Sequence, residues 1–167
     1  MKEVEGFEDF VRACNGIAHN LEGPQLTRAV KKGAQIVQKA IRAAAPKDTG
    51  ELSHGLILVK EKSRTKGKSV YQVTPAREKN HIFQKPIKNP VRSKAAHGYY
   101  PASQEYGYFT RRPGGGMTYV RGDGSQVTMD KVPGKHYMRT GAEVASEAAK
   151  NAISKSLFDE ITKEYGG

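Results

Sequence analysis

The 167-residue chain has little of what membrane-spanning or disulfide-stabilised proteins require. Cys14 is its only cysteine, so no intrachain disulfide can form and a reducing compartment such as the cytoplasm is expected. No segment approaches the roughly 20 apolar residues that cross a bilayer, and the first residues lack the basic start and apolar core of a secretory signal. We therefore expect no membrane association.

Acidic residues are scarce relative to basic ones. The 28 Lys and Arg residues against 17 Asp and Glu give a net charge of +11, and the window Lys60–His97 alone holds eleven basic and two acidic residues. Such a field favours a polyanionic partner, either nucleic acid or an acidic protein face. A solvated basic surface is equally compatible with the charge alone.

The length fits one domain that can bury a core without disulfides. Apolar residues at helical spacing predict amphipathic helices over residues 7–21, which Asn15-Gly16 could interrupt, over 26–44, ended by Pro46, and over 138–165. Cys14 lies on the apolar stripe of the first helix and is expected in the core. The other two stripes are rich in alanine, which suits close packing.

Two β-hairpins are predicted. The first pairs residues 56–60 with 69–73, and the second pairs 117–121 with 126–129 around an Asp-Gly turn. Residues 99–110 are aromatic and predicted to be strand-like.

The fold class expected from this order is α+β, with a largely antiparallel sheet packed against two long Ala-rich helices. Residues 76–97 lack periodicity and are predicted to form a long basic arm. Residues 114–131 are expected to form a hairpin extension, and residues 1–167 a single domain.

The triplet Asp-Thr-Gly begins at Asp48 and is the triplet of pepsin-like and retroviral proteases. Here no apolar strand precedes it, bulky Glu51 follows Gly50, and the chain has no second copy of it. A structural corner explains the stretch better than catalysis does. Pro46 would stop the helix, Asp48 would cap the next turn, Gly50 would permit a tight bend and Leu52 would anchor it.

Other catalytic signatures are missing from the sequence. The five histidines have no partners at metal-ligand spacing, and the three consecutive glycines at 114–116 lack the Lys-Ser/Thr of a phosphate loop. We therefore predict no catalytic, cofactor-binding or metal-binding residue and no enzyme.

Three stretches of the sequence form a recognisable set. The first is Ala-Pro-Lys-Asp-Thr-Gly-Glu-Leu at residues 45–52, which follows a long Ala-rich helix. The second is Tyr100 with Glu-Tyr-Gly at residues 105–107, and the third is Tyr-Met-Arg at residues 137–139. Together these stretches resemble the gene-product-ten family of tail-completion, or head–tail joining, proteins of long-tailed double-stranded DNA bacteriophages.

This resemblance implies a structural virion protein without a cofactor. Copies would form a ring, expected to be a hexamer, that terminates the tail tube and joins it to the head connector or stopper protein. DNA would pass through the ring only as cargo. The protein would be located in the neck of the virion and assembled in the host cytoplasm.

Within this interpretation, the cations of the arm would meet acidic faces of a neighbouring subunit or of the tube. These cations are Lys79, Lys85, Lys88, Arg92 and Lys94. Glu105 and Arg139 could form an ion pair within or between subunits. The alternative function is a basic nucleic-acid-binding domain, in which the same window binds phosphates while Tyr99 and Tyr100 stack on bases.

Overall fold

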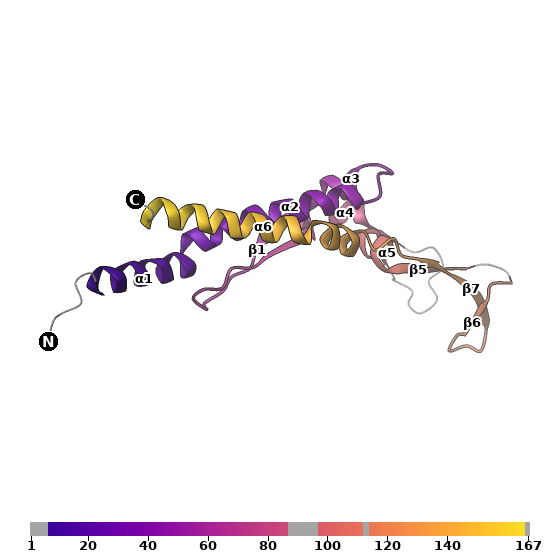
Figure 1. Cartoon of the computed structure of the whole chain (residues 1–167). Helices are drawn as coiled ribbons and strands as arrows, with labels where there is room; N and C mark the ends of the chain where they lie inside the picture. The colour runs from indigo at the N-terminus through magenta and orange to yellow at the C-terminus, as the bar shows by residue number, and fades with distance from the viewer. Residues whose placement is uncertain (1–6, 87–96, 112–113, 166–167) are drawn as a thin grey trace. The chain divides into compact units, whose positions relative to one another are not determined.

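A computed structural model describes residues 7–86, 97–111 and 114–165 (Figure 1). The chain divides into two compact units. The first unit comprises Met1–Ala40, Ile57–Thr74 and Ala142–Gly167, and the second comprises Ile41–Leu56 and Pro75–Gly141. That residues 1–167 behave as a single domain stays a prediction.

Three long helices confirm the predictions from apolar periodicity. They are α1 (Phe7–Glu22), α2 (Pro24–Ala44) and α6 (Tyr137–Tyr165). Helix α1 continues through Asn15-Gly16 without a break. Cys14 is exposed, so its predicted core position is wrong, and Val11 on the same helix is 39% exposed. Part of the apolar stripe of α1 is therefore not buried within the chain.

In the first unit, α2 and α6 pack closely because the residues between them are small. Ala29 and Ala149 are buried, and a Cβ atom on Gly33 would lie 2.6 Å from the Cδ1 atom of Ile153. Polar contacts border this seam, since Lys32 Nζ donates to Ser156 Oγ over 2.9 Å. The expectation of close, Ala-lined helix packing is confirmed.

Strands β1 (Leu56–Lys60) and β2 (Tyr71–Pro75) pair in a two-stranded sheet, as the first predicted hairpin requires. The backbone N–H of Glu61 donates to the carbonyl oxygen of Val70 over 2.9 Å and extends the pairing by one step. The residues between the two strands therefore form a loop supported by a hydrogen-bonded stem.

In the second unit, the first part of the predicted arm has regular structure, so the expectation of an irregular segment is wrong there. Phe83 is 1% exposed and packs edge-to-face against Tyr99, with ring centroids 6.3 Å apart, and this anchor orders the base of the arm. Residues 87–96 lie outside the described residues. The short elements are α3 (Glu51–His54), η1 (Arg77–Lys79), α4 (Asn80–Phe83), β3 (Gln84–Pro86) and β4 (His97–Tyr99), with β3 and β4 paired antiparallel.

The predicted strand over 99–110 is also wrong in its first part, because helix α5 (Tyr100–Tyr106) occupies it. Pro101 stands in the first turn of α5, where its fixed φ angle suits a helix and its missing N–H costs nothing. Gly107 ends α5 at a φ angle of 84°. The aromatic residues favoured a strand, but the proline and the glycine set the ends of a helix.

A three-stranded antiparallel sheet follows, in the order β5-β7-β6. Its strands are β5 (Gly107–Arg111), β6 (Met117–Val120) and β7 (Gln126–Pro133). The Asp-Gly turn that joins β6 to β7 has Gly124 at a φ angle of 79°, as the sequence predicted. The fold class is α+β, with its strands divided among three small sheets rather than one.

In the described part of the chain, no helix combines the length and apolar character needed to cross a membrane.

Candidate assembly site

The corner after α2 is built around Gly50 rather than around the triplet's carboxylate. Gly50 occupies the N-cap position of α3 at a φ angle of 75°, and no side chain caps that helix. The hydroxyl oxygen of Thr49 accepts a 3.4 Å hydrogen bond from the N–H of Glu51, while Asp48 is exposed. The expected capping by Asp48 is therefore not seen. Leu52 is 1% exposed and lies in the core of this unit.

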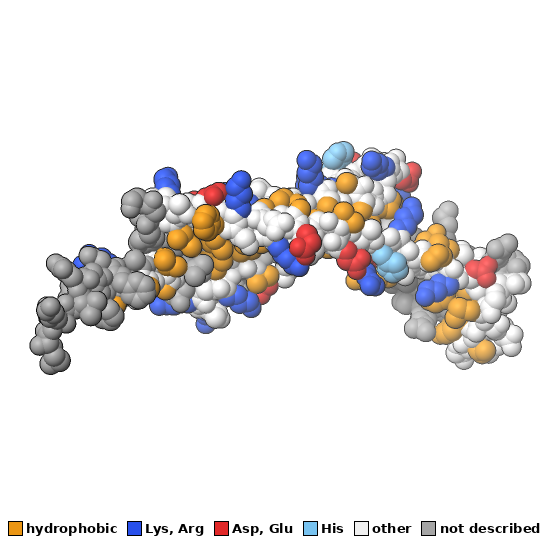
Figure 2. Space-filling model, in the orientation of Figure 1, with side chains coloured by type: hydrophobic (Ala, Val, Ile, Leu, Met, Phe, Trp, Pro, Cys, Tyr) orange, Lys and Arg blue, Asp and Glu red, His pale blue; other side chains and the backbone are white. Residues whose placement is uncertain are grey.

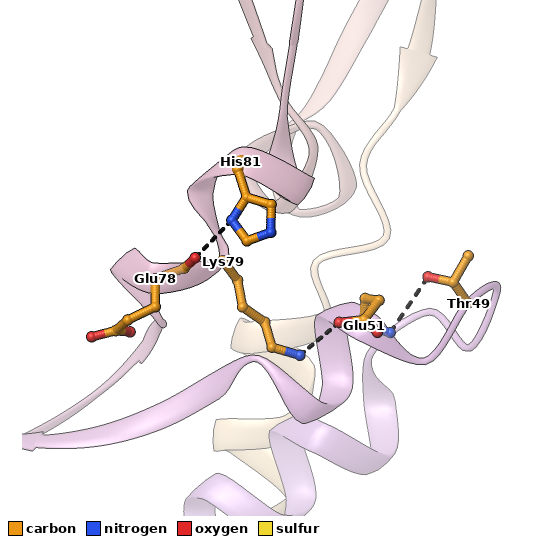
Figure 3. Close-up of polar contacts among 5 residues, drawn as sticks. All are labelled: Thr49, Glu51, Glu78, Lys79 and His81. Carbon is orange, nitrogen blue, oxygen red and sulfur yellow. Dashed lines mark hydrogen bonds and ion pairs between the residues drawn. The ribbon is translucent and has the colours of Figure 1, made fainter.

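Lys79, the first of the predicted arm cations, forms an ion pair within the second unit. Its ammonium group lies 2.6 Å from a carboxylate oxygen of Glu51 (Figure 3). This hydrogen bond and the lysine charge lower the pKa of Glu51 below its ordinary value. Because both side chains are partly exposed, the pair positions η1 against α3 more than it stabilises the fold.

A cleft of about 330 Å³ lies beside this corner, within the second unit. It brings together the first two stretches of the family resemblance, because residues of the corner and Tyr100 share its wall. Burial and the nearby charge of Asp48 raise the pKa of Tyr100, so its phenol stays protonated at neutral pH. The lining residues are Asp48, Thr49, Glu51, Ile82, Phe83, Lys85, Gly98, Tyr100 and Ser103.

The third stretch meets the second at Glu105. The Glu105 side chain is buried, and its carboxylate accepts the backbone N–H groups of Met138 over 2.8 Å and of Arg139 over 3.4 Å. These are donors in the first turn of α6, which has no earlier turn to satisfy them. Glu105 is thus an N-terminal cap of α6, supplied by a residue 33 positions earlier. The predicted ion pair between the two side chains stays a prediction.

Tyr137 is buried beside this cap. It is 1% exposed, and its hydroxyl group has no hydrogen-bond partner among the described residues. Burial, followed by the charge of Glu105, raises the pKa of Tyr137 well above its ordinary value, so the phenol stays neutral. The ring therefore contributes packing, while its hydroxyl is a desolvated polar group without compensation.

We expect Tyr137→Phe to leave the stability unchanged or to raise it by up to about 1 kcal/mol, because it removes a buried, unpaired hydroxyl and keeps the ring. Urea unfolding monitored by circular dichroism measures the change. A loss of more than about 1 kcal/mol would show that the hydroxyl has a partner after all.

The two faces of the three-stranded sheet differ in composition, and one of them carries most of its large apolar side chains. Residues opposite each other in antiparallel strands share a face, so the register places Phe109, Met117, Tyr119, Val127 and Met129 together. We call these five residues the apolar sheet face.

Hydrophobic side chains reach the surface over this sheet (Figure 2). Phe109 is 52% exposed and Met117 48% exposed. The opposite face carries Thr110, Thr118, Thr128 and Asp130, together with Tyr108, Val120 and Val132. Because β5 and β6 are the outer strands, the sheet also has two edges to which a further strand can be added.

The other predicted site residues are only partly accounted for. Lys85 lies in β3 and lines the cleft. Lys88, Arg92 and Lys94 fall outside the described residues, so the predicted role of the arm is not tested. Pro46 is half-buried at the corner. Among the residues that the structure describes, no group of three or more His, Cys, Asp or Glu side chains could hold a metal ion.

Comparison with known proteins identifies a family whose model covers about half of the chain. Residues 25–107 match the family model described as "Bacteriophage HK97-gp10, putative tail-component". The matched region begins in α2 and ends at the first residue of β5, so it includes the first two stretches of the resemblance. No curated protein and no solved structure matches the chain. The chain belongs to the HK97-gp10-like family of bacteriophage tail components.

Proposed function

We propose that copies of this chain form a ring, expected to be a hexamer, that terminates the tail tube and joins it to the head connector. The observation that carries the proposal is the apolar sheet face, on which Phe109 and Met117 are half-exposed, on a sheet whose outer strands pair with no further strand among the described residues. Membership of a tail-component family supports a role in the virion and contacts with other virion proteins. We assign no catalytic residue, cofactor or metal to this function.

The apolar sheet face is suited to a protein partner. Large apolar side chains exposed together are unfavourable in water, and their burial stabilises a complex by about 25 cal/mol for each Å² removed. Arg111 and Lys131 lie on the same face as Phe109 by register. The face therefore favours a partner surface with an apolar centre and acidic groups at its border.

Helix α6 offers such a surface on a second copy. Val144 is 78% exposed and Phe158 is 68% exposed. They stand fourteen positions apart, which is close to four helical turns, so both lie on one stripe. Exposed Glu147 and Asp159 stand near them in the sequence. Two different surfaces on each copy produce head-to-tail contacts, which close into a ring when the rotation permits.

We expect Phe109→Glu to prevent joining of heads and tails, because it places an unpaired charge in the interface. A cost of about 3 kcal/mol would weaken each contact about a hundredfold. The measurement is complementation of phage that lacks the gene, with particles examined by electron microscopy.

Thr118→Glu is the matched control, because it introduces the same charge on the opposite face of the sheet, where its register partner is the uncharged Thr128. It should restore joined particles, as the wild-type gene does. Circular dichroism must show both variants folded. Joined particles from phage without the gene would refute the proposed function, and normal assembly with Phe109→Glu would refute the assigned surface.

A further inference from the structure

The loop between β1 and β2 concentrates cations that have no partners. Four basic side chains stand at alternate positions, and all are exposed: Lys62, Arg64, Lys66 and Lys68. Within the described part of the chain, none of the four forms an ion pair or a side-chain hydrogen bond. We call residues 61–68 the basic loop.

Several cations elsewhere in the two units have partners. Lys79 pairs with Glu51, and the Arg28 guanidinium lies 3.5 Å from Glu160. The Arg42 guanidinium donates two hydrogen bonds to the carbonyl oxygen of Leu56. Within the basic window predicted from the sequence, Lys79 in the second unit is therefore paired, whereas the basic loop groups four cations that have no partner among the described residues.

A hollow of about 290 Å³ lies at the base of the basic loop and is lined mainly by donors. Among the described residues that line it, Glu61 is the one carboxylate, and it accepts a 3.3 Å hydrogen bond from the side-chain amide of Gln72. The N–H of Thr65 donates to Ser63 Oγ over 3.1 Å and helps to shape the loop. The lining residues are Lys60, Glu61, Lys62, Ser63 and Lys68.

The composition of the basic loop distinguishes between two kinds of polyanion. Residues 61–68 include no apolar or aromatic side chain, whereas the centres of protein interfaces are enriched in aromatic residues and depleted in lysine. Lysine, arginine and hydroxyl side chains are the usual contacts to phosphate oxygens. These contacts carry no information about base sequence.

We propose that the basic loop binds the phosphate backbone of duplex DNA without sequence preference. This goes beyond the proposed ring, in which DNA was expected only as passing cargo. Tyr99, which was considered for base stacking, is half-buried against Phe83, and the basic loop itself has no aromatic side chain. The binding is therefore electrostatic.

The test compares the full-length protein with a variant in which Lys62, Arg64, Lys66 and Lys68 are all changed to Gln. Affinity for a short duplex of arbitrary sequence is measured by fluorescence anisotropy across a salt series. Four phosphate contacts should make the slope of log binding affinity against log salt concentration more negative by about 3 to 4. We expect the variant to lose this component and to bind at least about tenfold more weakly at about 50 mM salt.

A second variant controls for net charge. It changes four exposed lysines on α2 and α6 to Gln, which removes the same charge from helical surfaces of the same unit: Lys31, Lys39, Lys155 and Lys163. It should retain the wild-type slope. Equal losses in both variants, or no loss in the loop variant, would overturn the proposal.

The complementation assay distinguishes a failure of this inference from a failure of the proposed function. The loop variant should still join heads to tails in the complementation assay, because the apolar sheet face is intact. If it binds DNA normally but fails to join them, the basic loop contacts an acidic protein and the proposal is wrong. If the wild-type protein binds DNA through the loop but forms no ring, the inference stands and the proposed function does not.

Discussion

Changing Gly107 or Gly134 to alanine should destabilise the second unit by about 3–5 kcal/mol, enough to unfold it in many molecules. Gly107 has φ and ψ angles of 84° and −178°, a region that is essentially closed to residues with a Cβ atom. A Cβ atom on Gly107 would also meet the carbonyl oxygen of Val132 and lie 2.7 Å from the backbone nitrogen of Gly134.

The approach between the two glycines is reciprocal. A Cβ atom on Gly134 would meet the carbonyl oxygen of Glu105 and lie 2.7 Å from the backbone nitrogen of Gly107. Because these neighbours are backbone atoms, no side-chain rotation can relieve the contact. The same segment places the carboxylate of Glu105 at the start of α6, so both substitutions should also disturb the cap.

Glycines in the neighbouring hairpin serve as controls. No atom lies within 4 Å of a Cβ built on Gly122, and its φ angle is not positive, so Gly122→Ala should change the stability by less than about 0.5 kcal/mol. Gly124→Ala isolates the conformational cost, because its φ angle is 79° but its surroundings are open. Urea unfolding ranks the variants, and a Gly107→Ala protein as stable as Gly122→Ala would contradict the described backbone.

Local patterns in the sequence were sufficient to predict the regular elements. The three long helices follow from apolar residues every three or four positions, and the β6–β7 hairpin follows from its Asp-Gly turn. Helix α5 was missed because its aromatic residues favour strands, whereas Pro101 and Gly107 fix a helix there. The base of the arm was missed because its order depends on Phe83 packing against Tyr99, a contact between distant residues.

The candidate site could be predicted only in part, for the same reason. The resemblance selected Glu105, Gly107 and Tyr137 without assigning them their observed contacts, because these contacts join residues about thirty positions apart. Predicting the apolar sheet face requires the register of three strands. The strand predicted over residues 99–110 did not place the start of β5 at Gly107, so this register could not be derived from the sequence. Asp48 was expected to cap the next turn, but Gly50, in a left-handed conformation, occupies the N-cap position of α3 instead.

Changing Glu105 to alanine should cost about 2–4 kcal/mol of stability. The substitution removes a buried carboxylate and leaves two N–H groups at the start of α6 without an acceptor, each at a cost of about 1–2 kcal/mol. Glu105→Gln keeps an acceptor oxygen but loses the negative charge that the N-terminus of a helix favours, so its cost should be about half as large. Urea unfolding with an unchanged slope measures both effects.

Glu147 provides a control for α6, because it is exposed and pairs only with Lys150 one turn away. Glu147→Ala should change the stability by less than about 0.5 kcal/mol. If Glu105→Ala were no more costly than this control, the cap would not be an important contact. We expect stability to increase from Glu105→Ala to Glu105→Gln to the wild type. The first difference measures the lost hydrogen bonds, and the second measures the lost charge.

The predicted ion pair between Glu105 and Arg139 can be separated from the cap by a double-mutant cycle. The cap uses the backbone N–H of Arg139, which Arg139→Met retains. If the cap accounts for the whole effect, the costs of Glu105→Gln and Arg139→Met should add within about 0.5 kcal/mol. A larger coupling would show that the guanidinium also stabilises the carboxylate. Because the cycle is measured on the purified protein, coupling that appears only in assembled particles would assign the pair to a contact between subunits.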